Sequence, residues 1–344
     1  MEISLILLCT LFISYMLSRY LSDSSSILYV ADKPNHRSLH TESTPRNGGI
    51  AIWLAFFSGY GTIRWLTDLT MAGEAYLWIG LALVMIISFI DDKQPLPPWL
   101  RFLIQMLATF LLLFGGFALT EINIPTFAVI TFGWFGPIFS FLFTMWLINL
   151  YNFMDGMNGF AGGMGLFGFA FFALLGWLGD NHSFFLISIF LSVANLGFLP
   201  HNFPTPNAKI FMGDVGSIPM GFMVAALSLW GIKAGLFTIW SAVLIFSPFI
   251  VDATITLVRR GILGKKVWVA HHSHCYQRLV QSGWSHQKTV LYEYLLMALF
   301  GTVAVLLELY SSEAIFGVGL LACSFCYLLL AVLVYHKTTS IAWD

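Results

Sequence analysis

Two adjacent acids form the first segment whose residue types could do chemistry. Asp91 and Asp92 end an apolar run and are followed by Lys93. Because neighbouring side chains on a helix diverge by about 100°, the two carboxylates cannot point the same way. We expect one to face a metal ion or phosphate and the other to orient a partner. An exposed helix end is the alternative, but acids at a helix C-terminus oppose the helix dipole.

A second segment carries a polar residue at every third position, namely Asn149, Asn152, Asp155 and Asn158. On a helix this spacing produces one slowly drifting stripe. The carboxamides can pair with a uracil edge, and Asp155 can orient a ribose or a metal-bound water. Polar contacts between packed helices are the alternative interpretation.

The third segment is an aspartate, Asp214, between glycines and shortly after Lys209 and Phe211. Such glycines expose backbone N–H groups, Ser217 can cap the helix that follows, and a helix N-terminus attracts anions. A hard oxygen ligand beside a phosphate cradle suits Mg²⁺ bound to a nucleoside diphosphate. A tight reverse turn would explain the glycines but would leave Asp214 and Lys209 without a reason.

Two further segments are basic. The first contains Lys33, Arg37 and Arg46 and leads into the glycine pair Gly48 and Gly49. Lysine and arginine suit phosphate, and paired glycines allow close backbone approach at a helix start. A positively charged loop on the inner side of a membrane, ending in a turn, explains the same residues equally well.

The last segment places His271, His272 and His274 within four residues and follows them with Arg278. The histidines could bind zinc, but mixed with arginine and without a His-Glu-x-x-His pattern they fit phosphate binding better. Asp252 lies inside the preceding apolar run. Because an acid in a membrane span is costly, we expect Asp252 to be paired or to belong to the site.

The elements that must position these segments are membrane spans. Of 344 residues, 58% are hydrophobic and 10% are charged, with a mean hydropathy of +0.82, whereas a soluble chain is about 25% charged. This excludes a water-soluble globular enzyme. A net charge of −1 lacks the basic field that nucleic-acid binding needs, so we expect no nucleic-acid partner.

A span needs about 20 apolar residues, and the runs that qualify or nearly do are 3–22, 47–66, 75–90, 100–119, 126–149, 157–177, 183–199, 216–232, 235–258, 289–309 and 314–335. The sequence therefore predicts one all-α integral-membrane domain over residues 1–344. We expect a polytopic transmembrane helical bundle of about 11 spans.

The positive charges predict how the bundle is oriented. With the N-terminus periplasmic and the C-terminus cytoplasmic, only Arg64 and Lys233 of the 16 lysines and arginines fall outside, as expected if cytoplasmic loops retain positive charge. The polar segments then share the cytoplasmic face, where we expect a catalytic cleft. The inner loops that would form it are 23–46, 91–99, 149–156, 200–215 and 259–288.

Taken in their order along the chain, the five segments resemble the polyprenyl-phosphate N-acetylhexosamine-1-phosphate transferase family, glycosyltransferase family 4. Residues 32–35 and 271–279 are most similar to the branch that starts O-antigen and related surface polysaccharides. The resemblance implies transfer of a sugar-1-phosphate from a UDP-N-acetylaminosugar to undecaprenyl phosphate with release of UMP. The donor would be UDP-GlcNAc or a derivative such as UDP-FucNAc or UDP-QuiNAc. It also implies Mg²⁺, or Mn²⁺ in its place, a bacterial inner membrane and often a homodimer.

The resemblance further implies roles for single residues. Asp214 would hold the metal ion together with Asp155, and Asp91 and Asp92 would be the other essential acids. We expect in-line displacement at the β-phosphorus, with the lipid phosphate positioned or deprotonated by Asp91 and the diphosphate gripped by His272, His274 and Arg278. The full set expected to bind substrate is Lys33, Arg37, Arg46, Asn149, Asn152, Asn158, Lys209, Phe211, His271, His272, His274 and Arg278.

The sequence departs from the family pattern at two places. Members that recognise uridine often have aspartate where this chain has Asn158, although an amide still pairs with uracil. The peptidoglycan relatives carry lysine within the segment that here reads 42–45, Glu-Ser-Thr-Pro, which argues against a muramoyl-pentapeptide donor. A transporter or flippase of a lipid-linked or polar solute is the alternative function, but it predicts polar residues at mid-membrane depth.

Overall fold

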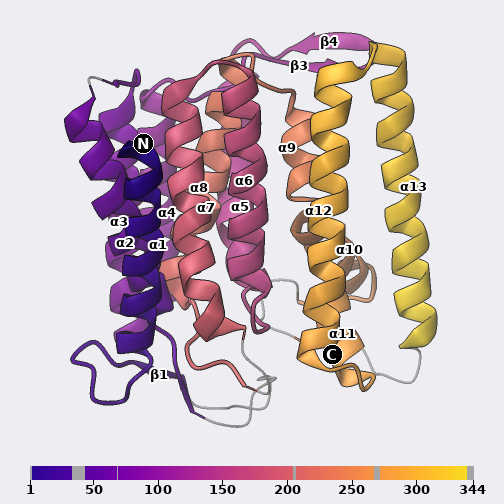
Figure 1. The fold of residues 1–344 in the computed structure, drawn as a ribbon. Helices are drawn as coiled ribbons and strands as arrows, with labels where there is room; N and C mark the ends of the chain where they lie inside the picture. The colour runs from indigo at the N-terminus through magenta and orange to yellow at the C-terminus, as the bar shows by residue number, and fades with distance from the viewer. Residues whose placement is uncertain (1, 33–42, 68, 204–206, 267–271, 339–344) are drawn as a thin grey trace.

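The computed structural model of the chain describes residues 2–32, 43–67, 69–203, 207–266 and 272–338. Over these residues it contains 13 α-helices and two short antiparallel strand pairs. The expected all-α membrane fold is therefore confirmed. Figure 1 shows the helices running mostly side by side, with the strand pair β3–β4 at one end of the bundle and β1 and α11 at the other.

The helices are α1 (Glu2–Leu21), α2 (Gly48–Leu66), α3 (Glu74–Lys93), α4 (Pro98–Phe114), α5 (Phe135–Met154), α6 (Phe160–Leu178), α7 (His182–Asn202), α8 (Asp214–Lys233), α9 (Ile239–Ile245), α10 (Ser247–Ile262), α11 (Cys275–Gln281), α12 (His286–Tyr310) and α13 (Glu313–Lys337). The strands are β1 (Ala31–Asp32), β2 (Thr44–Pro45), β3 (Glu121–Ile124) and β4 (Ala128–Thr131).

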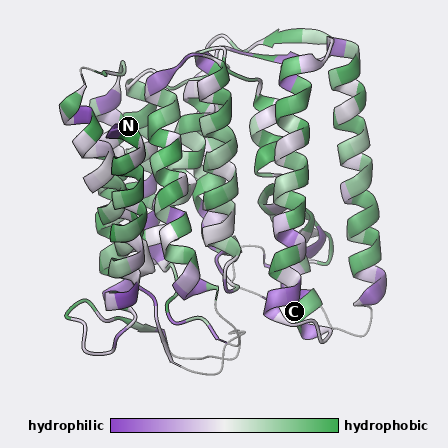
Figure 2. Ribbon diagram, in the orientation of Figure 1, coloured by the Kyte–Doolittle hydropathy of each residue, from purple (hydrophilic) through white to green (hydrophobic). Residues whose placement is uncertain are grey.

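Eight of these helices are long and apolar enough to cross a membrane, and the bent pair α9 and α10 makes a ninth candidate. Helices α2 and α4 coincide with the two remaining predicted runs. Each predicted span therefore has a helix, or this bent pair, within the described residues. Figure 2 shows hydrophobic residues along the middle of the helices and hydrophilic residues concentrated at the two ends of the bundle.

Two predicted spans differ from the helices found. The run 126–149 begins in a β-hairpin that pairs Ile122 with Ile130, and α5 begins only at Phe135, after Gly133 at φ 51°. The run 235–258 is bent by 83° between α9 and α10. Pro248 lies in the first turn of α10, where it has no N–H to donate and cannot continue a preceding helix.

Helix α8 lies at the centre of the bundle and is the most buried of the eight candidate spans. It packs against α2, α3 and α5, so its first turn meets the ends of the helices that carry the predicted acids. Helix α13 lies at the edge (Figure 1) and buries a single narrow stripe, Phe316, Cys323, Tyr327 and Ala331. The bundle is therefore tight around α8 and loose around α13.

Candidate active site

The two adjacent acids of α3 diverge as expected, and Asp92 turns toward the start of α8. Its carboxylate accepts hydrogen bonds from the backbone N–H groups of Asp214 at 3.3 Å and Val215 at 2.8 Å. Gly216 and Ser217 donate their N–H groups to the Gly213 carbonyl. The predicted phosphate cradle is thus already filled, because a helix N-terminus binds the nearest anion and here that anion is Asp92.

The loop before α8 is held by backbone pairing with the start of α2. The N–H of Phe211 donates to the Pro45 carbonyl, and the N–H of Gly48 donates back to the Phe211 carbonyl. A Cβ added at Gly49 would overlap the backbone of Gly216. The glycine pair therefore allows close backbone approach at the helix start, as expected, and the segment that approaches is α8.

Arginines link the acids of different helices. Arg46 donates to the Asp92 carbonyl at 3.0 Å and lies 3.2 Å from its carboxylate. Arg101, at the start of α4, lies 2.7 Å from the Asp91 carboxylate and 3.6 Å from that of Asp214. Since Arg101 remains about one third exposed, its guanidinium can still reach a bound anion.

The predicted polar stripe extends only to the end of α5. Asn152 donates to the carboxylate of Asp214 at 2.9 Å and to the hydroxyl of Ser217 at 3.0 Å. Asn149 instead donates to Gln105 on α4 at 3.1 Å. Because α5 ends at Met154, the remaining two members of the predicted stripe do not continue the helical face.

Beyond α5 the chain turns away from the helix axis. Asp155 is the C-cap residue with ψ 52°, and Asn158 precedes Gly159, which has a φ of 78°. Burial raises the pKa of Asp155 well above its usual range, and the carboxylates of Asp214 and Asp92 raise it further. The carboxylate of Asp32 acts in the same direction. The site thus concentrates negative charge from four separate segments.

These carboxylates fit a divalent cation. Among the described residues no three His, Cys, Asp or Glu side chains converge into a ready-made cage. Magnesium does not need one, since it binds through one or two carboxylates together with substrate phosphates and keeps several waters. Asp214 and Asp155 are hard oxygen donors. Burial first, and then the neighbouring carboxylates, raise the pKa of Asp155, and a bound cation would offset both by stabilising the ionised carboxylate.

The histidine-containing segment forms the short helix α11, whose start is fixed by Asp252. The Asp252 carboxylate accepts from the backbone N–H groups of Cys275 at 2.8 Å and Tyr276 at 3.1 Å. His274 approaches it at 3.4 Å. The expectation that Asp252 is paired is confirmed. On the opposite side of α11, the Tyr276 hydroxyl contacts Gly156, the residue after Asp155.

Two residues expected to grip the diphosphate are instead enclosed by packing. Arg278 is 1% exposed, and its guanidinium donates to the Thr338 hydroxyl at 3.0 Å and carbonyl at 2.7 Å. His274 is 2% exposed and lies parallel to the Tyr276 ring. The structure therefore places both with the packing of α11. This difference arises because sequence spacing does not reveal which side of a short helix is covered.

The other predicted substrate residues have different surroundings. Lys209 is exposed, and its backbone N–H donates to the His201 carbonyl. His272 is half-buried, and its carbonyl accepts from Gln281 at 2.9 Å. The predictions for Lys33, Arg37 and His271 concern residues outside those that the structure describes.

Arg101, Gln105 and Ser217 belong to the site but were not among the predicted site residues. Arg101 follows the acid pair and the prolines after it, and a cation at that position was a usable signal. Gln105 lies one helical turn further along α4 and is 4% exposed. A polar residue inside an apolar run was the signal there.

Comparison with known proteins agrees with this arrangement. Residues 75–232, from α3 to α8, match the model of a family described as glycosyl transferase family 4. The chain is 30% identical over 323 residues to the decaprenyl-phosphate N-acetylglucosaminephosphotransferase of Mycobacterium tuberculosis, covering 86% of this chain and 80% of that protein.

Two further relatives carry related names. Identity is 28% over 280 residues to the Bacillus subtilis protein named "Probable undecaprenyl-phosphate N-acetylglucosaminyl 1-phosphate transferase", covering 80% of this chain and 77% of the relative. The chain is also 27% identical over 324 residues to the undecaprenyl-phosphate alpha-N-acetylglucosaminyl 1-phosphate transferase of Escherichia coli O157:H7, covering 89% of this chain and 83% of that protein. The chain is therefore a multi-pass membrane enzyme that belongs to the polyprenyl-phosphate N-acetylhexosamine-1-phosphate transferases, glycosyl transferase family 4.

Proposed function

We propose that this protein transfers an N-acetylaminosugar-1-phosphate from a UDP-sugar to undecaprenyl phosphate, forming the first lipid-linked intermediate of a surface polysaccharide. The donor is UDP-GlcNAc or a 6-deoxy derivative such as UDP-FucNAc or UDP-QuiNAc. The observation that carries the proposal is the contact of Asp214 with both Asn152 and Arg101 at one end of the bundle. This contact brings three groups together at one place. They are a carboxylate that can bind a metal ion, an amide, and a cation that can bind phosphate.

The reaction we propose is a single displacement. A phosphate monoester has a second pKa near 6, by analogy with phosphorylated side chains, so the acceptor is mostly a dianion at neutral pH. One of its oxygens bonds to the β-phosphorus of the donor, while the bond from that phosphorus to the bridging oxygen breaks. The bridging oxygen leaves with the α-phosphate as UMP. Reactants and products carry the same total charge, so no proton transfer is required.

The main difficulty is to bring two anions together. Preorganised cations stabilise charge that develops on transferring phosphates, and Arg101 and Arg46 are placed among the acids to do so. Mg²⁺, or Mn²⁺ in its place, would screen the diphosphate when held by Asp214 and Asp155. Asn152 orients the Asp214 carboxylate by donating to it. Asp92 keeps Asp214 in place by capping α8.

We further propose that the protein lies in a bacterial inner membrane with this site at the cytoplasmic face, where nucleotide sugars are available. The two cations predicted to lie on the periplasmic side, Arg64 and Lys233, both interact with groups of the protein itself. Arg64 pairs with Glu74 at 3.1 Å, and Lys233 donates to the Gly116 carbonyl at 2.6 Å. This distribution supports a periplasmic N-terminus and a cytoplasmic C-terminus.

The test is UMP release by the purified protein in detergent with undecaprenyl phosphate and a panel of UDP-sugars. We expect turnover with one or more of UDP-GlcNAc, UDP-FucNAc and UDP-QuiNAc, none with UDP-muramoyl-pentapeptide, and loss of turnover on chelation of divalent cations. Asp214→Asn should abolish turnover, while Asp180→Asn, at an exposed position after α6, should leave it unchanged. Full turnover by Asp214→Asn at saturating Mg²⁺ would refute the metal assignment. A protein that moves lipid without releasing UMP would refute the transferase.

A further inference from the structure

The connection between α5 and α6, which carries Asp155, is held at its far end by two other helices. The carbonyl of Gly159 accepts a hydrogen bond from the hydroxyl of Tyr294 on α12 at 2.6 Å. The N–H of the same glycine donates to the side chain of Asn202 on α7 at 2.8 Å. These bonds fix the start of α6. Because they lie beyond Asp155 in the chain, the near end of the connection depends on other contacts.

Tyr276 of α11 supplies a contact at this near end. A Cβ added at Gly156 would overlap the hydroxyl oxygen of Tyr276, whereas the next nearest atoms, a side-chain nitrogen of Gln277 and Cζ of Tyr276, would lie at 3.4 and 3.5 Å. Gly156 is not among the glycines with a positive φ, so alanine can adopt its backbone conformation. Glycine is therefore required here by the close approach of one atom, the hydroxyl oxygen of Tyr276.

The Tyr276 side chain is enclosed, and its hydroxyl is not needed for that packing. The residue is fully buried, and its ring centre lies 4.9 Å from that of Phe160 at the start of α6 and 5.9 Å from that of His274. Among the described residues no group accepts the proton of this buried hydroxyl. Phenylalanine would pack in the same place without burying an unsatisfied polar group, which is costly. The hydroxyl thus calls for a role beyond packing, and its oxygen faces the backbone N–H of Gly156.

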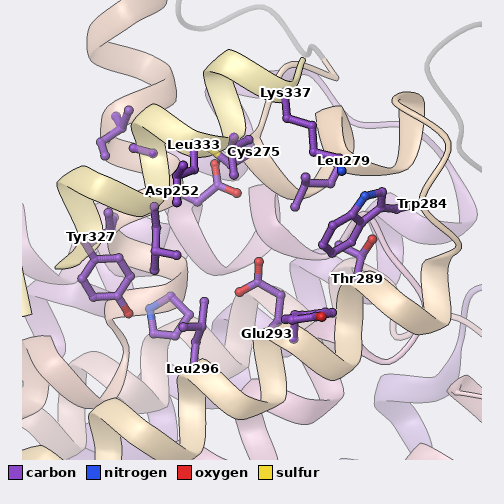
Figure 3. Close-up of a pocket in the computed structure, with 17 residues that line it drawn as sticks. Asp252, Cys275, Leu279, Trp284, Thr289, Glu293, Leu296, Tyr327, Leu333 and Lys337 are labelled. Carbon is purple, nitrogen blue, oxygen red and sulfur yellow. Dashed lines mark hydrogen bonds between the residues drawn. The ribbon is translucent and has the colours of Figure 1, made fainter.

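Helix α11 needs polar anchors because it borders empty space on its other side. A largely apolar cavity of about 290 Å³ lies there, and Figure 3 shows Asp252, Cys275 and Leu279 on its lining. The Asp252 carboxylate holds the start of the helix through the backbone N–H groups of Cys275 at 2.8 Å and Tyr276 at 3.1 Å. Since the second of these belongs to Tyr276, Asp252 fixes the residue that contacts Gly156.

We propose that Tyr276 is a positioning residue of the active site, whose hydroxyl holds Gly156 in place and thereby fixes the direction of the Asp155 carboxylate. Contacts then run without a break from Asp252 on α10 through α11 to the acid cluster. The inference rests on the proposed function, because it takes Asp155 as a metal ligand. Crowding or removing the hydroxyl should turn that carboxylate away from Asp214 and weaken the binding of a divalent cation.

The experiment is a double-variant cycle on the full-length protein in detergent, with binding of Mn²⁺ alone measured by electron paramagnetic resonance and stability by thermal unfolding. Gly156→Ala places a methyl group on the Tyr276 oxygen, so we expect Mn²⁺ binding at least about tenfold weaker and a lower unfolding temperature. Tyr276→Phe removes the oxygen and should weaken Mn²⁺ binding about threefold. In the double variant the methyl group occupies the space of the missing oxygen, so Mn²⁺ affinity should return to within about twofold of the wild type.

Tyr327→Phe is the matched control. It also removes a buried hydroxyl, which lies 2.6 Å from that of Ser247, and should keep the wild-type Mn²⁺ affinity even if the unfolding temperature falls. Losses that add in the double variant would overturn the proposal. So would wild-type Mn²⁺ affinity in both Gly156→Ala and Tyr276→Phe, because the contact would then be structural only. A wild type that binds no Mn²⁺ would refute the proposed metal site, and this inference with it.

Discussion

The carboxylate of Asp92, in the last turn of α3, accepts a 2.8 Å hydrogen bond from the backbone N–H of Val215, in the first turn of α8. A helix is usually capped by a residue from its own chain segment, but here the cap comes from a different helix. The residue before Asp214 is Gly213, with a φ of 73° and no capping side chain. The cap from α3 therefore fixes where Asp214 lies.

Removing this cap should destabilise the bundle. We expect Asp92→Ala to cost about 1–2 kcal/mol, as for loss of a helix cap, and to lower turnover by displacing Asp214. Asp92→Asn should lose less stability, because its amide oxygen still accepts from an N–H group. Thermal unfolding in detergent compares the two variants with the wild type. An unfolding temperature unchanged in Asp92→Ala would show that the cap is not needed.

Arg101 should matter for catalysis more than for stability. Its guanidinium bridges the buried Asp91 and the half-buried Asp214 but is itself about one third exposed, and ion pairs that remain in contact with water contribute little to folding. Removal of a charge-stabilising group commonly costs about 10²-fold in rate, so we expect a drop of that order in kcat for Arg101→Gln. Arg64→Gln breaks a similar ion pair, with Glu74, at the other end of the bundle and serves as the control. Equal kcat values for the two variants would contradict the assignment.

Two glycines of α2 should respond oppositely to alanine. A Cβ at Gly49 would overlap the backbone of Gly216, whereas one at Gly61 would meet nothing within 4 Å. Gly49→Ala should lower the unfolding temperature and the turnover, because α8 must shift. Gly61→Ala should leave both unchanged or raise stability by up to about 1 kcal/mol through helix propensity. Similar unfolding temperatures in the two variants would argue against the close approach.

Arg278 provides a direct test between structural support and substrate binding. Its buried hydrogen bonds to Thr338 predict that Arg278→Ala loses about 1–3 kcal/mol while the KM for the UDP-sugar stays the same. Thr338→Val should lose part of the same energy, and the double variant should show non-additivity. A raised KM at an unchanged unfolding temperature would instead restore the role in gripping the diphosphate.

The thiol of Cys275 should be slow to react. Burial and the neighbouring Asp252 carboxylate raise its pKa well above the ordinary value of 9.0, and only the thiolate reacts with alkylating reagents. In a variant whose other cysteines are serine, we expect iodoacetamide to label Cys275 at pH 8 more than about tenfold more slowly than free cysteine. The rate should rise as the pH increases beyond 9. Fast labelling at pH 8 in the folded protein would contradict the raised pKa of this thiol.

Much of this protein follows from the order and composition of its residues. Each apolar run coincides with a helix or with the bent pair α9 and α10, and eight or nine of these are long and apolar enough to cross a membrane, because a membrane imposes both length and hydrophobicity on a helix. The polar residues left between those runs were few, so the acids and amides that meet around Asp214 were identifiable from their spacing. The divergence of Asp91 and Asp92 followed from helical geometry alone.

Interactions between distant segments were not encoded in any local pattern. That Asp92 fills the N-terminus of α8, that Arg278 is enclosed against Thr338 and that Gly49 meets Gly216 depend on how helices far apart in sequence pack. A run of residues specifies a helix through local hydrogen bonds and hydropathy. Which groups fill its ends and cover its faces is decided only when the other helices pack against it, because those contacts join distant segments. Gly49 and Gly216, for example, are 167 residues apart.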